Sequence, residues 1–231
     1  MIYIPARLES QRLPKKLLLG VNGKPVLRWT WEHAKAVAPT TIVTDSKAIR
    51  DAAIGWGATV VYDVHKYANG TERIKAVAEG GFILHGDEPL VPSESISQFI
   101  SVQSSFHFPR MIAGCLKSAN DSRSDVKITG VLMDEHWGYG KIKGFSRDHG
   151  ILEVVGLSYF DDLSLYSSGG GGNYPNSFSK RESIEQARWL EGRHKHDLIA
   201  VQIKQRATAI DTEEDLKEAA AWLSSSTSMA S

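Results

Sequence analysis

Residues 40–62 read TTIVTDSKAIRDAAIGWGATVVY, and this stretch decides the fold class because two β-branched runs enclose a helical pattern. The runs at 40–44 and 58–62 are predicted strands, and Asp45 or Ser46 is suited to cap the helix between them. A strand, a helix and a second strand in this order form a right-handed unit whose two strands are parallel. The stretch therefore predicts an α/β protein.

The same alternation continues on both sides of this unit, over the first hundred residues. Further strands are predicted at 1–4 and at the apolar run 82–84. Three more helices are predicted from apolar side chains at helical spacing, namely Leu27, Trp31, Ala34 and Ala38, then Ile74, Val77 and Ala78, then Ile96, Phe99 and Ile100. We expect Thr71 to cap the second of these helices. The pattern predicts a Rossmann-like, mostly parallel sheet, in which ligands bind beyond the carboxyl ends of the strands.

The second half of the chain has weaker patterns. Residues 110–167 predict short strands, such as 127–129 and 153–155, without a strong helix. The glycine run Gly169–Gly172 is interpreted as passive linkage or disorder, with a mobile lid as the alternative.

The last part of the chain returns to the α/β pattern. A helix at 183–190 and a strand at 198–203 are predicted, followed by a final helix at 212–223. Thr212, with Asp215 three residues later, forms an acidic variant of the capping box at the start of that helix. The small polar end is expected to fray.

Composition narrows the class of protein. The formal net charge is zero, so no global field draws the chain to nucleic acid or to an anionic membrane. Cys115 is the single cysteine, which excludes an internal disulfide, fits a reducing compartment and suggests a small buried apolar residue. There is no charged leader before a long apolar run, and no stretch has the roughly twenty apolar residues of a membrane-spanning helix. We expect a cytoplasmic protein that binds neither nucleic acid nor membrane.

A basic loop follows the first predicted strand. Its four cations, Arg7, Arg12, Lys15 and Lys16, lie where charge-assisted hydrogen bonds could hold a triphosphate. On composition alone, a solvated basic loop is the simpler interpretation. The chain has no GxxxxGK[ST] motif, which disfavours a P-loop kinase or ATPase.

Two acidic segments lie at other predicted strand ends. Asp87 follows the strand at 82–84, and Asp211 lies between a predicted strand and the last helix. Taken alone, the first is explained by a β-turn and the second by an acid-rich helix N-terminus. Because both lie at strand ends, we predict that the two carboxylates converge on one Mg²⁺ site.

Six short motifs, in their order along the chain, carry a family resemblance. They are Ile4-Pro5-Ala6-Arg7 with Ser10, Arg12-Leu13-Pro14 and Lys16; Asn22-Gly23-Lys24-Pro25; Ala68-Asn69-Gly70-Thr71-Glu72-Arg73; Gly86-Asp87-Glu88-Pro89; Ile184-Glu185-Gln186; and Asp211-Thr212-Glu213-Glu214-Asp215-Leu216. Together they resemble the CMP-Kdo synthetases (3-deoxy-manno-octulosonate cytidylyltransferases). The resemblance is close over residues 1 to about 100 and moderate over 180–223.

The resemblance implies an activity and a set of site residues. Such enzymes bind CTP over the parallel sheet, and the anomeric hydroxyl of an acidic sugar attacks the α-phosphorus while pyrophosphate leaves. Asp87 and Asp211 would hold Mg²⁺, and Arg7, Arg12 and Lys16 would neutralise charge on the leaving group. The implied nucleotide-binding residues are Pro5, Ala6, Arg7, Ser10, Arg12, Lys16, Gly70, Thr71, Arg73 and His85. The implied sugar-binding residues are Arg147, Glu185 and Gln186. The product would serve surface polysaccharide or lipopolysaccharide synthesis.

The resemblance also implies an organisation of the chain. Residues 1–231 would form a single domain, with a nucleotide-binding part at 1–105 and a closing strand and helix at 201–223. The part at 106–200 would bind the sugar and contain a smaller β-rich segment that pairs two subunits. We therefore expect a homodimer by analogy.

The chain departs from the family pattern near the sugar. His85 replaces a usual Gln, and Val154 and Ser158 stand where the family places a His and a Tyr. An acidic sugar is thus better supported than Kdo itself, for which we expect kcat/KM to trail that of the true substrate by roughly tenfold or more. An amino-Kdo, which Glu185 could bind, or a nonulosonic acid is the alternative, as is a different nucleoside triphosphate. A non-catalytic nucleotide-binding homologue is a further alternative, although it would be expected to lose Asp87 and Asp211.

Overall fold

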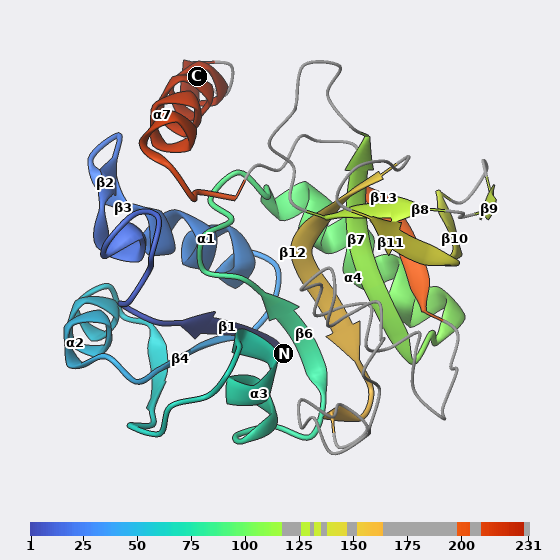
Figure 1. Cartoon of the computed structure of the whole chain (residues 1–231), viewed down its shortest axis with the longest axis horizontal. Helices are drawn as coiled ribbons and strands as arrows, with labels where there is room; N and C mark the ends of the chain where they lie inside the picture. The colour runs from blue at the N-terminus through green and yellow to red at the C-terminus, as the bar shows by residue number, and fades with distance from the viewer. Residues whose placement is uncertain are drawn as a thin grey trace.

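A computed structural model of the chain describes residues 1–116, 126–129, 132–134, 138–146, 152–163, 198–203 and 209–228. These residues form one eleven-stranded mixed sheet with helices packed against it, and a separate two-stranded hairpin (Figure 1). The sheet order is β5-β4-β1-β6-β12-β7-β13-β10-β9, with β8 and β11 beside this path. The α/β prediction is confirmed.

The first half of the chain supplies the parallel part of the sheet. Its strands are β1 (Ile2–Ala6), β4 (Thr40–Thr44), β5 (Thr59–Tyr62) and β6 (Gly81–Leu84). All neighbouring pairs among them are parallel. Alternate residues of β1 are buried, as a strand between two layers requires.

The helices of this half cover the sheet. They are α1 (Val26–Lys35), α2 (Lys47–Gly55), α3 (Gly70–Lys75) and α4 (Ser93–Phe106). Leu27 and Phe99 pack from α1 and α4 into one core cluster, whereas Ile74 of α3 packs into another with Ile83 and Phe160. Between β1 and α1 lie the 3₁₀ turn η1 (Lys16–Leu18) and the hairpin strands β2 (Gly20–Val21) and β3 (Lys24–Pro25).

Two helix starts test the predicted caps. The Ser46 hydroxyl accepts the Ile49 N–H at 3.3 Å, so Ser46 caps α2 as predicted. The prediction that Thr71 caps α3 is wrong, because Asn69 Oδ1 accepts the Glu72 N–H at 2.9 Å. The helix begins at Gly70, two residues earlier than a Thr71 cap would give, which places Thr71 in its first turn with a buried side chain.

The second half adds mostly antiparallel strands. The long ones are β7 (Arg110–Leu116), β12 (Leu152–Phe160) and β13 (Ile199–Ile203). The short ones are β8 (Lys127–Thr129), β9 (Leu132–Asp134), β10 (Tyr139–Lys141) and β11 (Gly144–Ser146). The β12 strand pairs antiparallel with both β6 and β7, so it joins the parallel half of the sheet to the rest.

The last helix, α7 (Glu213–Ser228), extends beyond its predicted end at 223. It lies beside the β2–β3 hairpin (Figure 1), where Asn22 Nδ2 donates to the Ala220 carbonyl at 2.7 Å and to Ser224 Oγ at 3.0 Å. These contacts continue past residue 223, so fraying does not begin there. The predicted helix at 183–190 and the glycine run at 169–172 lie outside the described residues.

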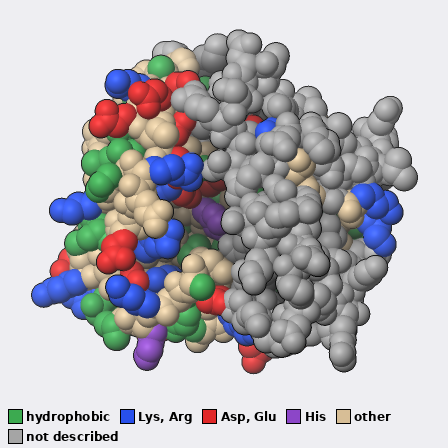
Figure 2. All heavy atoms as spheres, viewed as in Figure 1, with side chains coloured by type: hydrophobic (Ala, Val, Ile, Leu, Met, Phe, Trp, Pro, Cys, Tyr) green, Lys and Arg blue, Asp and Glu red, His purple; other side chains and the backbone are tan. Residues whose placement is uncertain are grey.

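The surface and core of the described part agree with the composition. Cys115 is buried in the main core cluster, as predicted. Basic and acidic side chains are interspersed on the face shown in Figure 2 rather than gathered by sign. Among the described helices, none combines the length and the apolar character that crossing a bilayer requires.

Candidate active site

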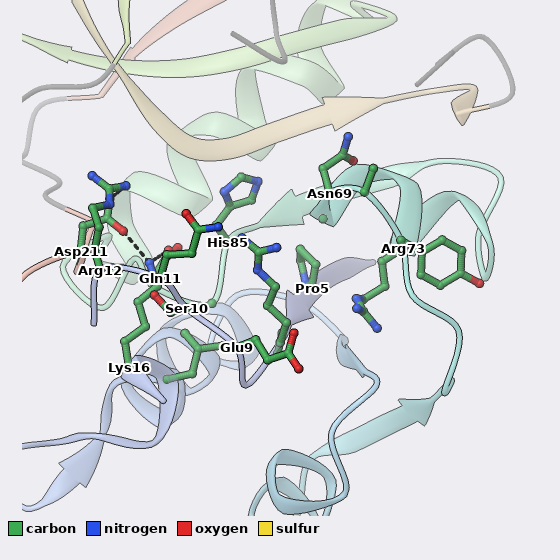
Figure 3. A pocket seen from close by; sticks show the side chains of 18 residues that line it. Pro5, Glu9, Ser10, Gln11, Arg12, Lys16, Asn69, Arg73, His85 and Asp211 are labelled. Atoms are coloured by element: carbon green, nitrogen blue, oxygen red, sulfur yellow. Dashed lines mark hydrogen bonds and ion pairs between the residues drawn. The ribbon is translucent and has the colours of Figure 1, made fainter. Parts of the chain in front are cut away.

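A cavity of about 380 Å³ opens beyond the carboxyl ends of β1 and β6. Its walls come from the basic loop after β1, the start of α3, the turn after β6 and the loop before α7. Every predicted nucleotide-binding residue except Thr71 lines it. Figure 3 shows Arg12, Lys16 and Asp211 at one end of the cavity, and Asn69 and Arg73 at the other. The two ends offer different chemistry.

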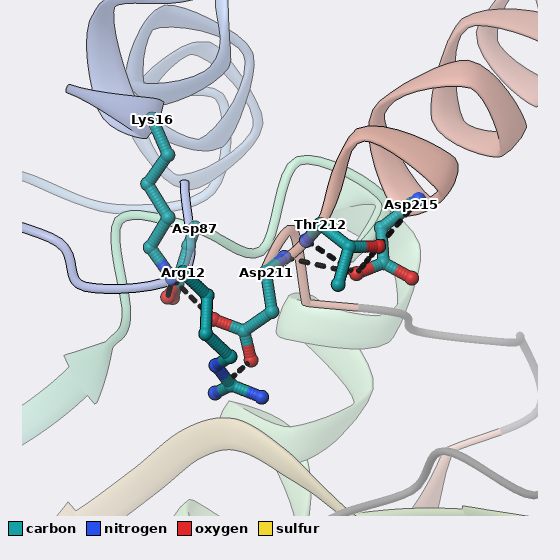
Figure 4. Close-up of polar contacts among 6 residues, drawn as sticks. All are labelled: Arg12, Lys16, Asp87, Asp211, Thr212 and Asp215. Atoms are coloured by element: carbon teal, nitrogen blue, oxygen red, sulfur yellow. Dashed lines mark hydrogen bonds and ion pairs between the residues drawn. The ribbon is translucent and has the colours of Figure 1, made fainter. Parts of the chain in front are cut away.

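The first end gathers two carboxylates around one cation (Figure 4). Lys16 Nζ donates to Asp87 Oδ2 at 2.5 Å and to Asp211 Oδ1 at 2.7 Å. Arg12 Nη2 donates to the other oxygen of Asp211, Oδ2, at 2.7 Å. The predicted convergence of Asp87 and Asp211 is thus present, with the Lys16 ammonium between them.

These ions are largely removed from water. The side chains of Lys16, Asp87 and Asp211 are 13%, 22% and 21% exposed. Burial opposes the charge of Lys16, but the two carboxylates outweigh it and hold the pKa of the ammonium above its ordinary value. Burial likewise opposes the charge of Asp87, but Lys16 and His85 hold the pKa of that carboxyl below its ordinary value. Both groups of this pair are therefore charged at neutral pH.

The backbone around the two aspartates fixes their relative position. The Ile210 N–H donates to the Asp87 carbonyl at 2.9 Å, which joins the two loops directly. Behind Asp87, Thr30 Oγ1 donates to the Gly86 carbonyl at 3.1 Å. A Cβ at Gly86 would lie 3.0 Å from Leu27 Cδ1, so glycine allows the turn to approach α1.

Asp211 is also fixed from the helix that follows it. Asp215 Oδ2 accepts the N–H groups of Asp211 and Thr212 at 3.1 and 2.8 Å, and the Asp215 N–H donates to Thr212 Oγ1 at 3.2 Å. This is the predicted acidic capping box. It holds Asp211 in the loop shortly before α7, rather than at the strand end where sequence patterns placed it, since β13 ends at Ile203.

The two aspartates fit a Mg²⁺ ion. A single cation, the Lys16 ammonium, already lies within hydrogen-bond distance of both carboxylates and stands in for a metal ion there. No group of three or more His, Cys, Asp or Glu in the described ranges is arranged to hold a metal ion. Mg²⁺ is usually bound through one or two carboxylates and keeps several waters, so two aspartates suffice.

The opposite end of the cavity is built around Arg73. Its side chain is 5% exposed, and its Nη2 donates to Asp45 Oδ2 at 2.7 Å. Its Nη1 is buried and has no hydrogen-bond partner among the described residues. A Cβ at Gly70 would lie 2.9 Å from Pro5 Cγ, so a larger residue would push the start of α3 away from β1. Tyr67 and Asn69 also line this end. The sequence placed Asn69 in a family motif but predicted neither of them as a binding residue.

A third feature lies where β12 meets the turn after β6. The Gly156 carbonyl accepts the His85 N–H at 2.8 Å, and the Gly156 N–H donates to Glu88 Oε1 at 2.7 Å. A Cβ at Gly156 would lie 2.7 Å from Glu88 Oε1, so only glycine fits this approach. Burial raises the pKa of Glu88 to about 8, which keeps the carboxyl neutral at pH 7. The contact ties β12 to the turn that carries Asp87.

Comparisons with known proteins identify the family. A model of the family described as Cytidylyltransferase matches residues 1–105. The 3-deoxy-manno-octulosonate cytidylyltransferase of Photobacterium profundum is 31% identical over 254 residues, which cover 96% of this chain and 98% of the relative. The enzyme of that name from Acaryochloris marina is 30% identical, and the match covers 95% of each chain. The chain belongs to the 3-deoxy-manno-octulosonate cytidylyltransferase family.

A solved structure supports the same fold for this cytidylyltransferase. CMP:2-keto-3-deoxy-manno-octonic acid synthetase complexed with CTP matches with a TM-score of 0.81 at 23% identity, covering 97% of this chain and 98% of the other. The family resemblance and the prediction of a nucleotidyltransferase are confirmed.

The predicted sugar-binding part of this cytidylyltransferase is only partly described. Arg147, Glu185 and Gln186 lie outside the described residues, so their predicted roles stay predictions. Val154 packs against a core cluster, and Ser158 pairs with Ile83 and Ile112 on the neighbouring strands. Neither residue lines the cavity between Lys16 and Arg73.

Proposed function

We propose that this cytidylyltransferase transfers CMP from CTP to the anomeric hydroxyl of Kdo or a Kdo-like acidic sugar, with Mg²⁺, and releases pyrophosphate. One observation carries the proposal: Asp87 and Asp211, far apart in sequence, converge on one cation beside the basic loop. The names of the relatives support Kdo, and the CTP-bound structural neighbour supports the nucleotide.

The surroundings of Arg73 favour the second end of the cavity as the binding site of a pyrimidine base. Cytosine presents acceptors at O2 and N3, whereas uracil presents a donor at N3. A buried guanidinium with an unused N–H can pair with acceptors and rejects a donor, because the mismatch leaves buried polar groups unpaired. We therefore assign Arg73 to the base, together with the neighbouring backbone at Pro5, Ala6 and Gly70.

The basic loop favours the first end of the cavity as the binding site of the phosphates. When bound, Mg²⁺ supplies charge neutralisation, and Asp87 and Asp211 would hold it. In the proposed reaction the sugar oxygen forms a bond to the α-phosphorus, the bond from that phosphorus to the bridging oxygen of pyrophosphate breaks, and the hydroxyl proton goes to solvent. Arg7, Arg12 and Lys16 stabilise the charge that moves onto pyrophosphate. No protein nucleophile is needed.

The alternatives are weighed by the same geometry. A non-catalytic homologue would have no need for two carboxylates and three cations around one cavity, so we favour an active enzyme. An amino-Kdo or a nonulosonic acid is the alternative substrate. The lower kcat/KM expected for Kdo itself stays a prediction. We also retain two predictions from the sequence, a cytoplasmic location and a homodimer, and sedimentation in solution would test the second.

CTP is expected to raise the melting temperature more than any other ribonucleotide in the presence of Mg²⁺. A ligand at about a hundred times its Kd stabilises the native state by about 2.7 kcal/mol. For a chain of this length that corresponds to a shift of roughly 5–10 °C. Thermal melts with CTP, UTP, ATP and GTP at equal concentration measure it. An equal or larger shift with ATP or GTP would contradict the assignment of the base.

A further inference from the structure

Two more acidic side chains, neither of which lines the cavity, follow neighbouring parallel strands close to Arg73 and Tyr67. Asp45 follows β4, and Asp63 follows β5. The Asp63 N–H donates to the Thr44 carbonyl at 2.9 Å, which places the two strand ends side by side. Asp45 holds Arg73 directly. Asp63 has no direct role in the reaction proposed above.

Asp63 instead holds Tyr67. The Tyr67 hydroxyl donates to Asp63 Oδ2 at 2.6 Å. The other oxygen, Oδ1, accepts the His65 N–H at 3.0 Å and lies 2.6 Å from His65 Nδ1. The hydrogen bond from Tyr67 is the largest of the effects that lower the pKa of Asp63 to about 2. The Asp63 carboxylate therefore stays ionised at neutral pH. Its effect on Tyr67 is the reverse, since the bond raises the pKa of the hydroxyl and keeps it a donor.

Tyr67 in turn lies against Arg73. The Arg73 guanidinium carbon lies 5.5 Å from the centre of the Tyr67 ring, within the range of a cation–π contact. Arg73 therefore meets a carboxylate on one side and an aromatic ring on another, while Nη1 remains without a partner among the described residues. Tyr67 and Arg73 both line the cavity.

The backbone between these side chains is also held. Glu72 Oε2 accepts the Ala68 N–H at 2.9 Å, and Asn69 caps α3. The backbone between Ala68 and Glu72 is thus held, and Tyr67 itself is held by its hydroxyl contact with Asp63 and its ring contact with Arg73. A guanidinium that must present one N–H to a base discriminates better between bases when its orientation is fixed before the nucleotide binds.

We propose that Tyr67 and Asp63 are positioning residues, which orient Arg73 for recognition of the base of CTP. The proposal rests on the proposed function. It predicts that loss of the Tyr67–Asp63 contact weakens nucleotide binding and base selection and leaves the chemical step unchanged.

A double-mutant cycle tests this proposal. Tyr67→Phe keeps the ring and removes the hydroxyl, and Asp63→Ala removes the acceptor. We expect each to raise the Kd of CTP by roughly five- to tenfold, and the double variant to raise it no further, because all three lose the same contact. The ratio of CTP to UTP affinity should fall together with the CTP affinity. In contrast, kcat and the KM of the sugar should stay within about twofold of the wild-type values.

Two further variants separate positioning from general damage. Asp63→Asn keeps an acceptor oxygen and should restore most of the affinity, whereas His65→Ala should bind CTP as the wild type does. Additive losses in the cycle, an unchanged Kd in Tyr67→Phe, or a fall in kcat alone would overturn the proposal while leaving the proposed function intact. A wild-type chain that binds no CTP would overturn the proposed function and this proposal together.

Discussion

Asp87→Asn is expected to lower turnover at least about a hundredfold, on the order of 3 kcal/mol of transition-state stabilisation. The amide keeps the shape of the side chain but removes the charge that would hold Mg²⁺. Asp211→Asn should have an effect of similar size because its carboxylate faces the same cation. Initial rates of pyrophosphate release at saturating CTP measure both losses.

The combination of the two changes is informative. Since both carboxylates serve one site, the double variant should lose little more than either single variant. Glu213→Gln is the matched control: it removes one charge two residues from Asp211, from an exposed side chain at the start of α7. If Glu213→Gln loses as much activity as Asp211→Asn, the loss is an effect of net charge. Near-normal rates in both Asn variants would contradict the proposed metal site.

Lys16→Met is the second change with a large expected effect. The methionine keeps most of the chain length and removes the ammonium that we place on the phosphates, so turnover should again fall about a hundredfold. A second measured quantity, the affinity for Mn²⁺, should instead increase. Lys16 occupies the space between Asp87 and Asp211, so we expect it to compete there with a divalent cation.

Without the ammonium, the two adjacent carboxylates remain, and Arg12 still donates to Asp211. We expect Lys16→Met to bind Mn²⁺ in the absence of nucleotide at least about tenfold more tightly than the wild type, as titration followed by electron paramagnetic resonance would show. Lys15→Met makes the same change of charge one residue away and should bind Mn²⁺ as the wild type does. Equal Mn²⁺ affinity in all three chains would mean that Lys16 does not block the site.

The sequence predicted the first half of the fold well because its patterns are local. A strand or helix is present at each predicted place between residues 1 and 106, since β-branched runs and helical spacing act within a few residues. Two helices are shorter than predicted: α1 ends at Lys35, before Ala38, and α3 ends at Lys75, before Val77 and Ala78. The error at Thr71 is also local in origin. Asn69 and Thr71 are both good capping residues, and only the backbone shows that Asn69, with φ −152°, stands in the extended conformation of a cap.

The parts that the sequence did not predict depend on contacts between distant segments. Glu88 and Gly156 meet only because β12 pairs with β6, and no pattern in either segment indicates that partner. Likewise Asp63 becomes a neighbour of Asp45 through the register of β4 and β5. Lys16 was predicted to face phosphate, and the structure places its ammonium between the carboxylates of Asp87 and Asp211, whose mutual repulsion it offsets.

The most direct test of the central claim is the rate of pyrophosphate release with Mg²⁺, CTP and one acidic sugar at a time. Kdo, an amino-Kdo and a sialic acid form the panel, with reactions lacking sugar and reactions with ATP, GTP or UTP as references. The account predicts release that requires both CTP and a Kdo-type sugar and that nearly disappears in Asp87→Asn. Release that is fastest with another nucleotide, release without sugar, or no release with any pair would contradict it.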